Sequence, residues 1–307
     1  MKKYQRAMLI YNGNAGQGDL EKTLSACVPT LLAHLPHLLI LQTTEKNEAK
    51  KLCEQYGEEM DLVIVLGGDG TLHECVNGLA NLEKRPVIAL LPGGTCNDFS
   101  RALGMSQNLK KAAEEILSGE VVPVDVMQVN EDFFLNFWGI GLVAETSTNI
   151  DDAEKALWGK MSYYLSAIRT IRQMDPFYYS IQCDGERIEG EAVMILVANG
   201  NFIGAKGLPF KGISYDDGMA NLFIIKNTNL TLLKELLLTD VTADDDSLAN
   251  EVMHFCGQEL IVETDSPMTA DTDGEVYMKT PAIIKAKKHH LRMIKPVVEI
   301  SQINVLA

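Results

Sequence analysis

Three glycine-rich loops, each placed directly after a short apolar run, constrain the fold of this chain more than any other feature. The loops are Asn12 to Gly18, Gly67 to Thr71 and Pro92 to Asp98, and the runs before the last two are Leu62 to Leu66 and Val87 to Leu91. These runs are continuous rather than alternating, as expected for strands buried on both faces of a parallel sheet. Parallel strands joined by crossovers end at one rim of their sheet, so we expect the loops to share the rim where such folds bind ligands.

The first 125 residues alternate strand-like and helix-like segments, which is the rhythm of an α/β domain. Strands are expected at Ala7 to Tyr11, Leu38 to Gln42, Leu62 to Leu66 and Val87 to Leu91, and helices at Leu20 to Ala33, near Glu45 to Tyr56 and near Leu72 to Asn81. After Asp125, short strands flank tight turns at Asn130-Glu131-Asp132, Asp184-Gly185 and Asp273-Gly274, with helices near Ala156 to Met174 and Leu230 to Val241. We therefore expect an α/β domain of residues 1–125, joined again by about 297–307, and a β-rich domain of residues 126–296.

Composition narrows the function class. The chain has 307 residues, of which 46% are apolar, and a formal charge of −15. This apolar content supports a buried core and argues against global disorder. The acidity argues against nucleic acid as a partner, because affinity for a phosphate backbone comes mainly from Lys and Arg.

Cysteine spacing and hydropathy bear on location. The six cysteines contain no C-x-x-C pair, which fits neither a zinc cage nor a disulfide framework. The apolar run Ala7 to Tyr11 is too short for a signal peptide, and no run approaches the roughly 18 apolar residues of a membrane span. We expect a reduced, cytoplasmic protein.

The glycine loops suggest a phosphate site. Glycines at a sheet rim let backbone N–H groups approach phosphate oxygens, and the N-terminus of the following helix adds partial positive charge. No loop contains G-x-x-x-x-G-K-[ST] or completes G-x-G-x-x-G, so the common P-loop and Rossmann fingerprints are absent. One such loop is equally well explained as a tight turn, but three on one rim favour phosphate binding.

Two motifs carry a family resemblance. The first is Gly67-Gly68-Asp69-Gly70-Thr71 followed by Glu74, Asn77 and Gly78, and the second, more specific one is Pro92-x-Gly94-Thr95-x-Asn97-Asp98-Phe99-x-Arg101. Together they resemble the diacylglycerol kinase catalytic domain of bacterial lipid kinases, with further matches over nearly the whole chain. The resemblance implies a three-layer α/β nucleotide-binding domain, like that of NAD kinases and phosphofructokinases, followed by an antiparallel β-sandwich.

The same resemblance implies an ATP-dependent, Mg²⁺-dependent kinase that phosphorylates a hydroxyl of diacylglycerol or a related lipid. It assigns nucleotide contacts to Asn12, Gly13, Asn14, Ala15, Gly16, Thr44, Gly67, Gly68, Asp69, Gly70, Thr71, Glu74, Gly94, Thr95 and Asn97. Gly13 stands where the family usually has proline, which predicts a looser first loop. The partner would be a lipid at the inner face of the membrane, which the protein would contact transiently. Whether the protein forms a homodimer is left open.

Carboxylates supply the expected metal ligands. Asp69 and Asp98 lie in the two rim loops and Asp125 ends the α/β segment, so all three could converge on one Mg²⁺. By resemblance, Asp217 with the carbonyls of Ser214 and Met219 would form a second, structural Mg²⁺ site. The alternative is an Asp-Gly turn before a strand at Met219 to Ile225.

The tripeptide Asp-Gly-Glu occurs twice, as Asp184-Gly185-Glu186 and as Asp273-Gly274-Glu275. Both can be plain hairpin turns. In the family the functional triplet lies near the C-terminus, so the resemblance implies that Asp273 or Glu275 activates the acceptor hydroxyl. The choice between these two stays open, and Asp184 is interpreted as a turn residue.

Two other functions remain as alternatives. One is a NAD kinase with a soluble acceptor, against which the Pro92 to Arg101 motif argues. The other is a nucleotide or lipid sensor without activity, against which the full set of carboxylates argues. His73 is interpreted as a surface histidine rather than a catalytic base.

Overall fold

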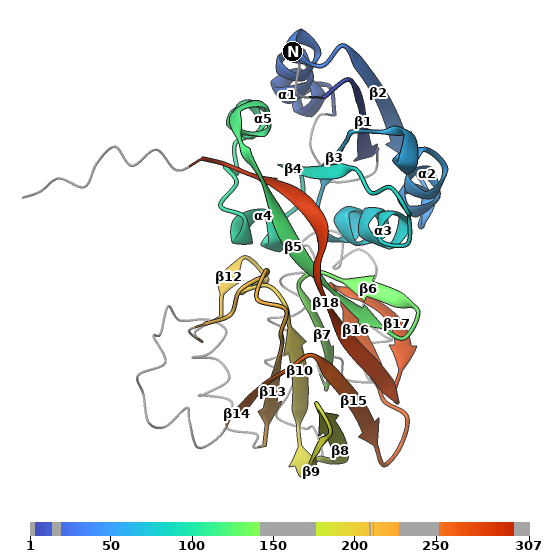
Figure 1. The fold of residues 1–307 in the computed structure, drawn as a ribbon, viewed down its shortest axis with the longest axis vertical. Coiled ribbons are helices and arrows are strands. Elements are labelled where there is room, and N and C mark those ends of the chain that lie inside the picture. The colour runs from blue at the N-terminus through green and yellow to red at the C-terminus, as the bar shows by residue number, and fades with distance from the viewer. Residues whose placement is uncertain are drawn as a thin grey trace, which may run out of the picture.

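The structure is a computed structural model that describes residues 4–13, 20–141, 176–208, 210, 212–226 and 252–297. Figure 1 shows two lobes, an upper one of strands and helices and a lower one of strands, with two long strands running through both. The fold class expected from the sequence, an α/β domain followed by an antiparallel β-sandwich, is confirmed.

The upper lobe is built on four parallel strands in the order β2-β1-β3-β4. Their bounds are β1 Arg6–Asn12, β2 His37–Thr43, β3 Leu62–Gly67 and β4 Val87–Pro92. The helices are α1 Leu20–His34, α2 Glu48–Tyr56, α3 Asp69–Leu79, α4 Asp98–Ala102 and α5 Leu109–Ser118, with a 3₁₀ turn, η1, at Gly57–Glu59. Helix α1 packs on α5 and α2 packs on α3, and the two pairs cover opposite faces of the sheet (Figure 1). Burial of β3 and β4 on both faces explains their continuous apolar sequences.

The lower lobe is a sandwich of two antiparallel layers. In the described part of the chain one layer has the order β14-β13-β10-β7-β16-β17, and the other contains β15, β8 and β9. The bounds are β7 Phe137–Ile140, β8 Phe177–Cys183, β9 Glu186–Ala192, β10 Met194–Ala198, β13 Ala220–Ile225, β14 Val252–Gly257, β15 Glu259–Thr264, β16 Thr269–Thr272 and β17 Glu275–Lys279. A small hairpin, β11 Phe202–Ile203 with β12 Lys206–Gly207, lies beside helix α4. Buried residues such as Trp138, Tyr179 and Ile284 fill the space between the layers.

Two long antiparallel strands, β5 (Glu120–Val129) and β18 (Ala282–Lys295), join the lobes (Figure 1). The first part of β18 pairs with β15 and contributes to the sandwich core. Its last part packs in the upper core through Leu291, Met293 and Ile294, and Met293 pairs with Ile88 of β4. The chain therefore re-enters the upper lobe at Leu291, earlier than the segment 297–307 named from the sequence, of which 298–307 lie outside the described residues.

The predicted hairpins are confirmed, because their turn residues accept left-handed backbone. Strands β5 and β6 (Asp132–Phe134) flank Asn130, with φ 51°; β8 and β9 flank Asp184, with φ 48°; β16 and β17 flank Asp273, with φ 52°. Asn and Asp tolerate this region better than other non-glycine residues. The helices expected near Ala156 to Met174 and Leu230 to Val241 lie outside the described residues. Within the described residues, no helix is long and apolar enough to cross a membrane.

Candidate active site

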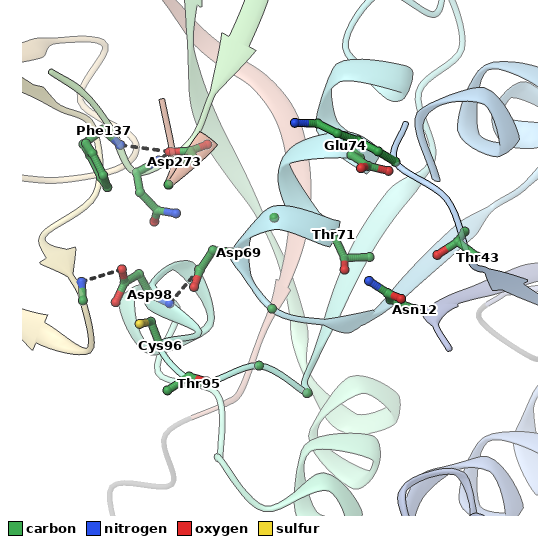
Figure 2. Close-up of a pocket in the computed structure, with 18 of the residues that line it drawn as sticks. Asn12, Thr43, Asp69, Thr71, Glu74, Thr95, Cys96, Asp98, Phe137 and Asp273 are labelled. Atoms are coloured by element: carbon green, nitrogen blue, oxygen red, sulfur yellow. Dashed lines mark hydrogen bonds between the residues drawn. The ribbon is translucent and has the colours of Figure 1, made fainter. Parts of the chain in front are cut away.

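A cavity of about 540 Å³ opens at the carboxyl ends of the parallel strands, with residues of the lower lobe forming part of its wall (Figure 2). Eleven residues singled out from the sequence line it: Asn12, Thr44, Gly68, Asp69, Gly70, Thr71, Glu74, Gly94, Thr95, Asp98 and Asp273. The second and third glycine loops therefore meet at one cavity on the rim of the parallel sheet. Asn14, Ala15 and Gly16 lie outside the described residues.

The second and third glycine loops touch through their backbones. A Cβ atom on Gly94 would lie 2.4 Å from the Cα of Gly68, which is closer than any real contact of this kind. The N–H of Gly93 donates to the carbonyl of Gly67 at 2.9 Å. Glycine at these positions therefore allows a backbone-lined floor next to the N-terminus of α3, a geometry suited to phosphate oxygens.

Asp69 and Asp98 form a buried acidic pair on this floor. The backbone N–H of Asp98 donates to Asp69 Oδ1 at 2.8 Å (Figure 2). Burial, together with the charge of Asp98, raises the pKa of Asp69 to about 7, and burial also raises the pKa of Asp98. Two adjacent carboxylates that resist ionisation are an arrangement that a divalent cation relieves, so this pair fits Mg²⁺.

Asp98 also connects the lobes. Its Oδ2 accepts the N–H of Gly204 at 2.7 Å (Figure 2), and its Oδ1 accepts the N–H of Ala205. Gly204 and Ala205 both have φ 64°, so their N–H groups point in one direction and form a nest for the carboxylate. The metal-ligand candidate in the upper lobe is thereby held by the lower lobe.

Several predicted contact residues support the loops rather than the cavity surface. Asn97, buried and with φ 53°, accepts the N–H of Gly94 at 2.9 Å and donates to its carbonyl at 2.9 Å. Glu74 lines the cavity, but its carboxylate accepts the N–H groups of Asn47 and Ala49 at the start of α2. The N–H of Gly13 donates to the carbonyl of Thr43 at 2.8 Å, a bond that proline could not make.

Asp125 does not join Asp69 and Asp98. Its fully buried carboxylate accepts the N–H of His289 at 2.6 Å and the N–H of Gly218, and it does not line the cavity. Residues 120–129 continue as one long strand beyond the rim, which carries Asp125 to the junction with β18. The expected convergence of three carboxylates is therefore not seen.

The proposed second metal site has the form of a turn. Asp217 Oδ1 accepts the N–H of Met219 at 2.8 Å, while the hydroxyl of Ser214 bonds to Asp216. Burial and then Asp125 raise the pKa of Asp217. Within the described residues, no group of three or more His, Cys, Asp or Glu side chains is arranged to hold a metal ion.

Asp273 is the most heavily bonded carboxylate near the cavity. Its Oδ1 accepts the N–H of Asn136 at 2.8 Å and the N–H of Phe137 at 3.0 Å, the latter shown in Figure 2. Its Oδ2 accepts the N–H of Leu135 at 3.0 Å and lies 3.1 Å from His73 Nδ1. Glu275 begins β17 two residues later, and its side chain lies outside the described part of the structure.

The interpretation of His73 as a surface histidine was wrong. Its residue is 5% exposed, because β6 and the Asp273 turn pack over that face of α3. Helical spacing shows which face a residue occupies but not what covers the face, so no local signal could have revealed this.

Other cavity residues were missed by sequence reasoning: Thr43, Glu45, Lys46, Gly93, Cys96, Asn136, Phe137, Gly204 and Gly274. Most adjoin residues that were named, and the loop positions of Gly93 and Cys96 were a usable signal. Asn136, Phe137 and Gly204 reach the cavity only because the lower lobe folds against the rim.

Comparison with known proteins agrees with this geometry. Residues 6–129 match the model of the diacylglycerol kinase catalytic domain, and residues 139–295 match the YegS C-terminal NAD kinase beta sandwich-like domain. A candidate lipid kinase of Staphylococcus carnosus (strain TM300) is 33% identical over 95% of this chain and 97% of its own length. A lipid kinase relative from Staphylococcus haemolyticus (strain JCSC1435) is 31% identical over 95% of this chain and 97% of its own length.

Solved structures extend the similarity to three dimensions. The structure of a candidate diacylglycerol kinase from Bacillus anthracis str. Sterne matches with a TM-score of 0.88 and 44% identity, covering 96% of this chain and 98% of that one. A diacylglycerol kinase structure from the same organism matches with a TM-score of 0.86 and 43% identity over the same shares. The chain therefore belongs to the lipid kinase family whose members join a diacylglycerol kinase catalytic domain to a YegS-type C-terminal β-sandwich.

Proposed function

We propose that the protein uses ATP and Mg²⁺ to phosphorylate a hydroxyl of diacylglycerol or a related lipid. The observation that carries this proposal is the contact of the Gly68 and Gly94 loops beside the Asp69 and Asp98 pair, inside a cavity shared by both lobes. Phosphoryl transfer depends on positioning and charge stabilisation more than on covalent chemistry by the protein, and this arrangement supplies both.

The upper lobe binds the nucleotide in this proposal. The backbone around Gly68, Gly70 and Gly94, at the N-terminus of the 11-residue helix α3, receives the phosphates. Asn12 and Thr43 lie at the other end of the cavity in Figure 2, where polar side chains can bind the nucleoside.

Asp69 and Asp98 are the proposed metal ligands. A magnesium ion held by them would supply positive charge that neutralises the ATP phosphates. Asp69 contributes from the start of α3 and Asp98 from the start of α4, so both carboxylates are held by rigid elements. The pKa values of both carboxyl groups are raised, so two ionised carboxylates side by side are unfavourable without a cation. A bound cation offsets that unfavourable energy.

We assign acceptor activation to Glu275. The carboxylate of Asp273 already has four polar partners in a 2% exposed side chain, so it has no accessible position for a further proton. In the proposed step, Glu275 accepts the proton of the lipid hydroxyl while that oxygen bonds to the γ-phosphorus and ADP leaves.

The lower lobe supplies the acceptor side. Asn136 and Phe137 line the cavity there, and Asn136 Oδ1 is buried with no hydrogen-bond partner among the described residues. An acceptor hydroxyl or headgroup donor could satisfy this oxygen. We further propose transient contact with a membrane surface, because the net charge of −15 opposes tight binding to an anionic leaflet.

The test is incubation with γ-labelled ATP, Mg²⁺ and separate acceptors: diacylglycerol, phosphatidylglycerol, sphingoid bases and NAD. We expect label in a lipid product with the wild-type protein and none with Asp69→Asn. Label in NAD alone would make the protein a soluble-acceptor kinase. The absence of labelled lipid in every detergent and vesicle would overturn the proposal.

A further inference from the structure

His73 is a buried residue of the nucleotide-binding helix that the proposed chemistry does not use directly. It lies on α3 one turn after Asp69 and does not line the 540 Å³ cavity. It borders a separate cavity of about 390 Å³, together with Asn77 and Asp132. A role in contacting ATP is therefore not indicated, and the question is what its imidazole ring does instead.

Asn77 lies against the His73 ring and connects α3 to β6. The Asn77 amide is oriented by the backbone of Phe133, since Oδ1 accepts its N–H at 2.9 Å and Nδ2 donates to its carbonyl at 2.9 Å. The same Nδ2 lies 3.2 Å from His73 Nε2. Nδ2 also donates to the carbonyl of His73 at 3.0 Å, so its two hydrogens serve the two carbonyls.

His73 Nδ1 lies 3.1 Å from Asp273 Oδ2, across 200 residues of sequence. Because this carboxylate accepts three backbone N–H groups and acts as an acceptor only, the contact places a proton on Nδ1, which donates to Oδ2. This contact is largely shielded from water, because the side chains are 5% and 2% exposed. In a site of low dielectric, a hydrogen bond to a carboxylate is strong, and its loss leaves an acceptor unsatisfied.

Asp273 connects His73 to the part of the cavity proposed to bind the acceptor. Its remaining bonds hold the N–H groups of Leu135, Asn136 and Phe137. Asp273 itself opens the turn that leads into Glu275. A single carboxylate therefore links α3, whose first residue is Asp69, to the cavity wall and to the strand that carries the proposed base.

We propose that His73 is a positioning residue that, through Asp273, sets the place of Glu275 and of the Asn136-Phe137 wall relative to the phosphate-binding start of α3. The inference rests on the proposed function and deepens it. It predicts an effect on turnover rather than on nucleotide affinity, because His73 touches the acceptor-side network and not the nucleotide cavity.

The experiment compares His73→Leu, His73→Asn and the control Val76→Ala by steady-state lipid phosphorylation. Leucine removes the donor, whereas asparagine can place its Nδ2 near the position of Nδ1. Val76 is a fully buried core residue on the same helix, so its truncation reports general destabilisation of α3. We expect kcat to fall about 10- to 100-fold in His73→Leu with KM for ATP unchanged, which corresponds to one hydrogen bond to a charged group.

The His73→Asn variant distinguishes the loss of the hydrogen bond from the loss of packing in the core. We expect His73→Asn to recover most of kcat, and Val76→Ala to lower the melting temperature while the folded enzyme keeps its kcat. Undiminished kcat in His73→Leu, or no recovery in His73→Asn when that variant melts like the wild type, would overturn the inference.

Amide hydrogen exchange provides a readout that does not depend on activity. We expect the amides of Leu135, Asn136 and Phe137 to exchange faster in His73→Leu than in the wild type, and to be protected again in His73→Asn. Unchanged exchange in His73→Leu counts against the link even if the wild type phosphorylates no lipid. An inactive wild type would contradict the proposed function, so the two failures are distinguishable.

Discussion

Gly68 and Gly94 approach each other so closely that a Cβ on Gly94 would stand 2.4 Å from the Cα of Gly68. These residues come from loops that follow neighbouring parallel strands, β3 and β4, which are hydrogen-bonded along their length. The contact brings Asp69 and Asp98, the next acidic residue of each loop, into a single site.

Gly94→Ala should disrupt that site. The added methyl group must push the two loops apart by about 1 Å to reach ordinary contact distance, and displacements of that size can lower catalysis about 100-fold. We expect KM for ATP to rise and kcat to fall, measured by steady-state phosphorylation.

The matched control is Gly207→Ala in the β12 hairpin. A Cβ there meets only the carbonyl of Asn201 at 4.0 Å, and the residue is exposed. We expect activity unchanged and unfolding free energy within about 0.5 kcal/mol of the wild type. Equal activity of the two variants would show that the loop contact is dispensable.

Asp69→Asn should abolish transfer while stabilising the ligand-free protein at alkaline pH. The folded-state pKa of about 7 lies above the ordinary aspartate pKa of 3.8, so the folded state binds this proton more tightly than the unfolded state. Ionisation of Asp69 therefore costs folding free energy, a cost that grows as pH rises from about 4 and is complete above about 7. Asparagine keeps the Oδ1 acceptor for the Asp98 N–H without the charge.

Urea unfolding of both proteins from pH 4 to pH 8 checks this prediction. The stability advantage of Asp69→Asn should be near zero at pH 4, increase with pH and level off above pH 7. A constant difference across this range would mean that the Asp69 carboxyl titrates normally.

The same substitution in the two Asp-Gly-Glu turns should have different effects on activity. Asp184 and Asp273 have similar φ angles, 48° and 52°, so replacement by alanine strains both turns alike. Asp184 is exposed and accepts the N–H groups of Gln258 and Glu259, far from the cavity residues. We expect Asp184→Ala to lose about 1 kcal/mol of stability with activity unchanged.

Asp273→Ala should behave differently, because it leaves three buried N–H groups without an acceptor. We expect a stability loss of about 3 kcal/mol or more, and transfer at about 1% of the wild-type rate in the protein that remains folded. Denaturant titration and lipid phosphorylation measure the two effects separately. Normal activity in folded Asp273→Ala would show that Asp273 is not required for phosphoryl transfer.

Glu275→Gln tests the assignment of the base. Removing a general base typically costs 10²- to 10⁴-fold in rate, so we expect kcat to fall by at least about 100-fold with KM for ATP unchanged. Glu186→Gln, the equivalent residue of the other tripeptide, is the control and should retain full activity. Normal turnover in Glu275→Gln would move the base role to another group.

Much of the fold could be predicted because its signals are local. The apolar runs at Leu62 to Leu66 and Val87 to Leu91 are long enough for strands and too uniform for a half-exposed sheet, and both are fully buried. The hairpin turns follow from residues that tolerate positive φ. The rim position of the glycine loops follows from the direction of parallel strands.

The positions of the candidate metal-binding carboxylates could be predicted only in part. Asp69 and Asp98 lie together because each follows a strand of the same parallel pair. Asp125 belongs to a strand that continues past the rim, and its partners, Gly218 and His289, are 93 and 164 residues away. Sequence spacing contains no information on such partners.

By itself, the sequence determined the two-part architecture, the glycine-rich rim and the acidic residues on it, because strand burial, turn chemistry and crossover direction act over a few residues. Only the tertiary structure decided that His73 is buried against Asp273, that Asp273 is saturated with donors, and that β18 joins both lobes. These features depend on which distant surfaces pack together, and burial then turns an ordinary polar residue into part of an interdomain hydrogen-bond network.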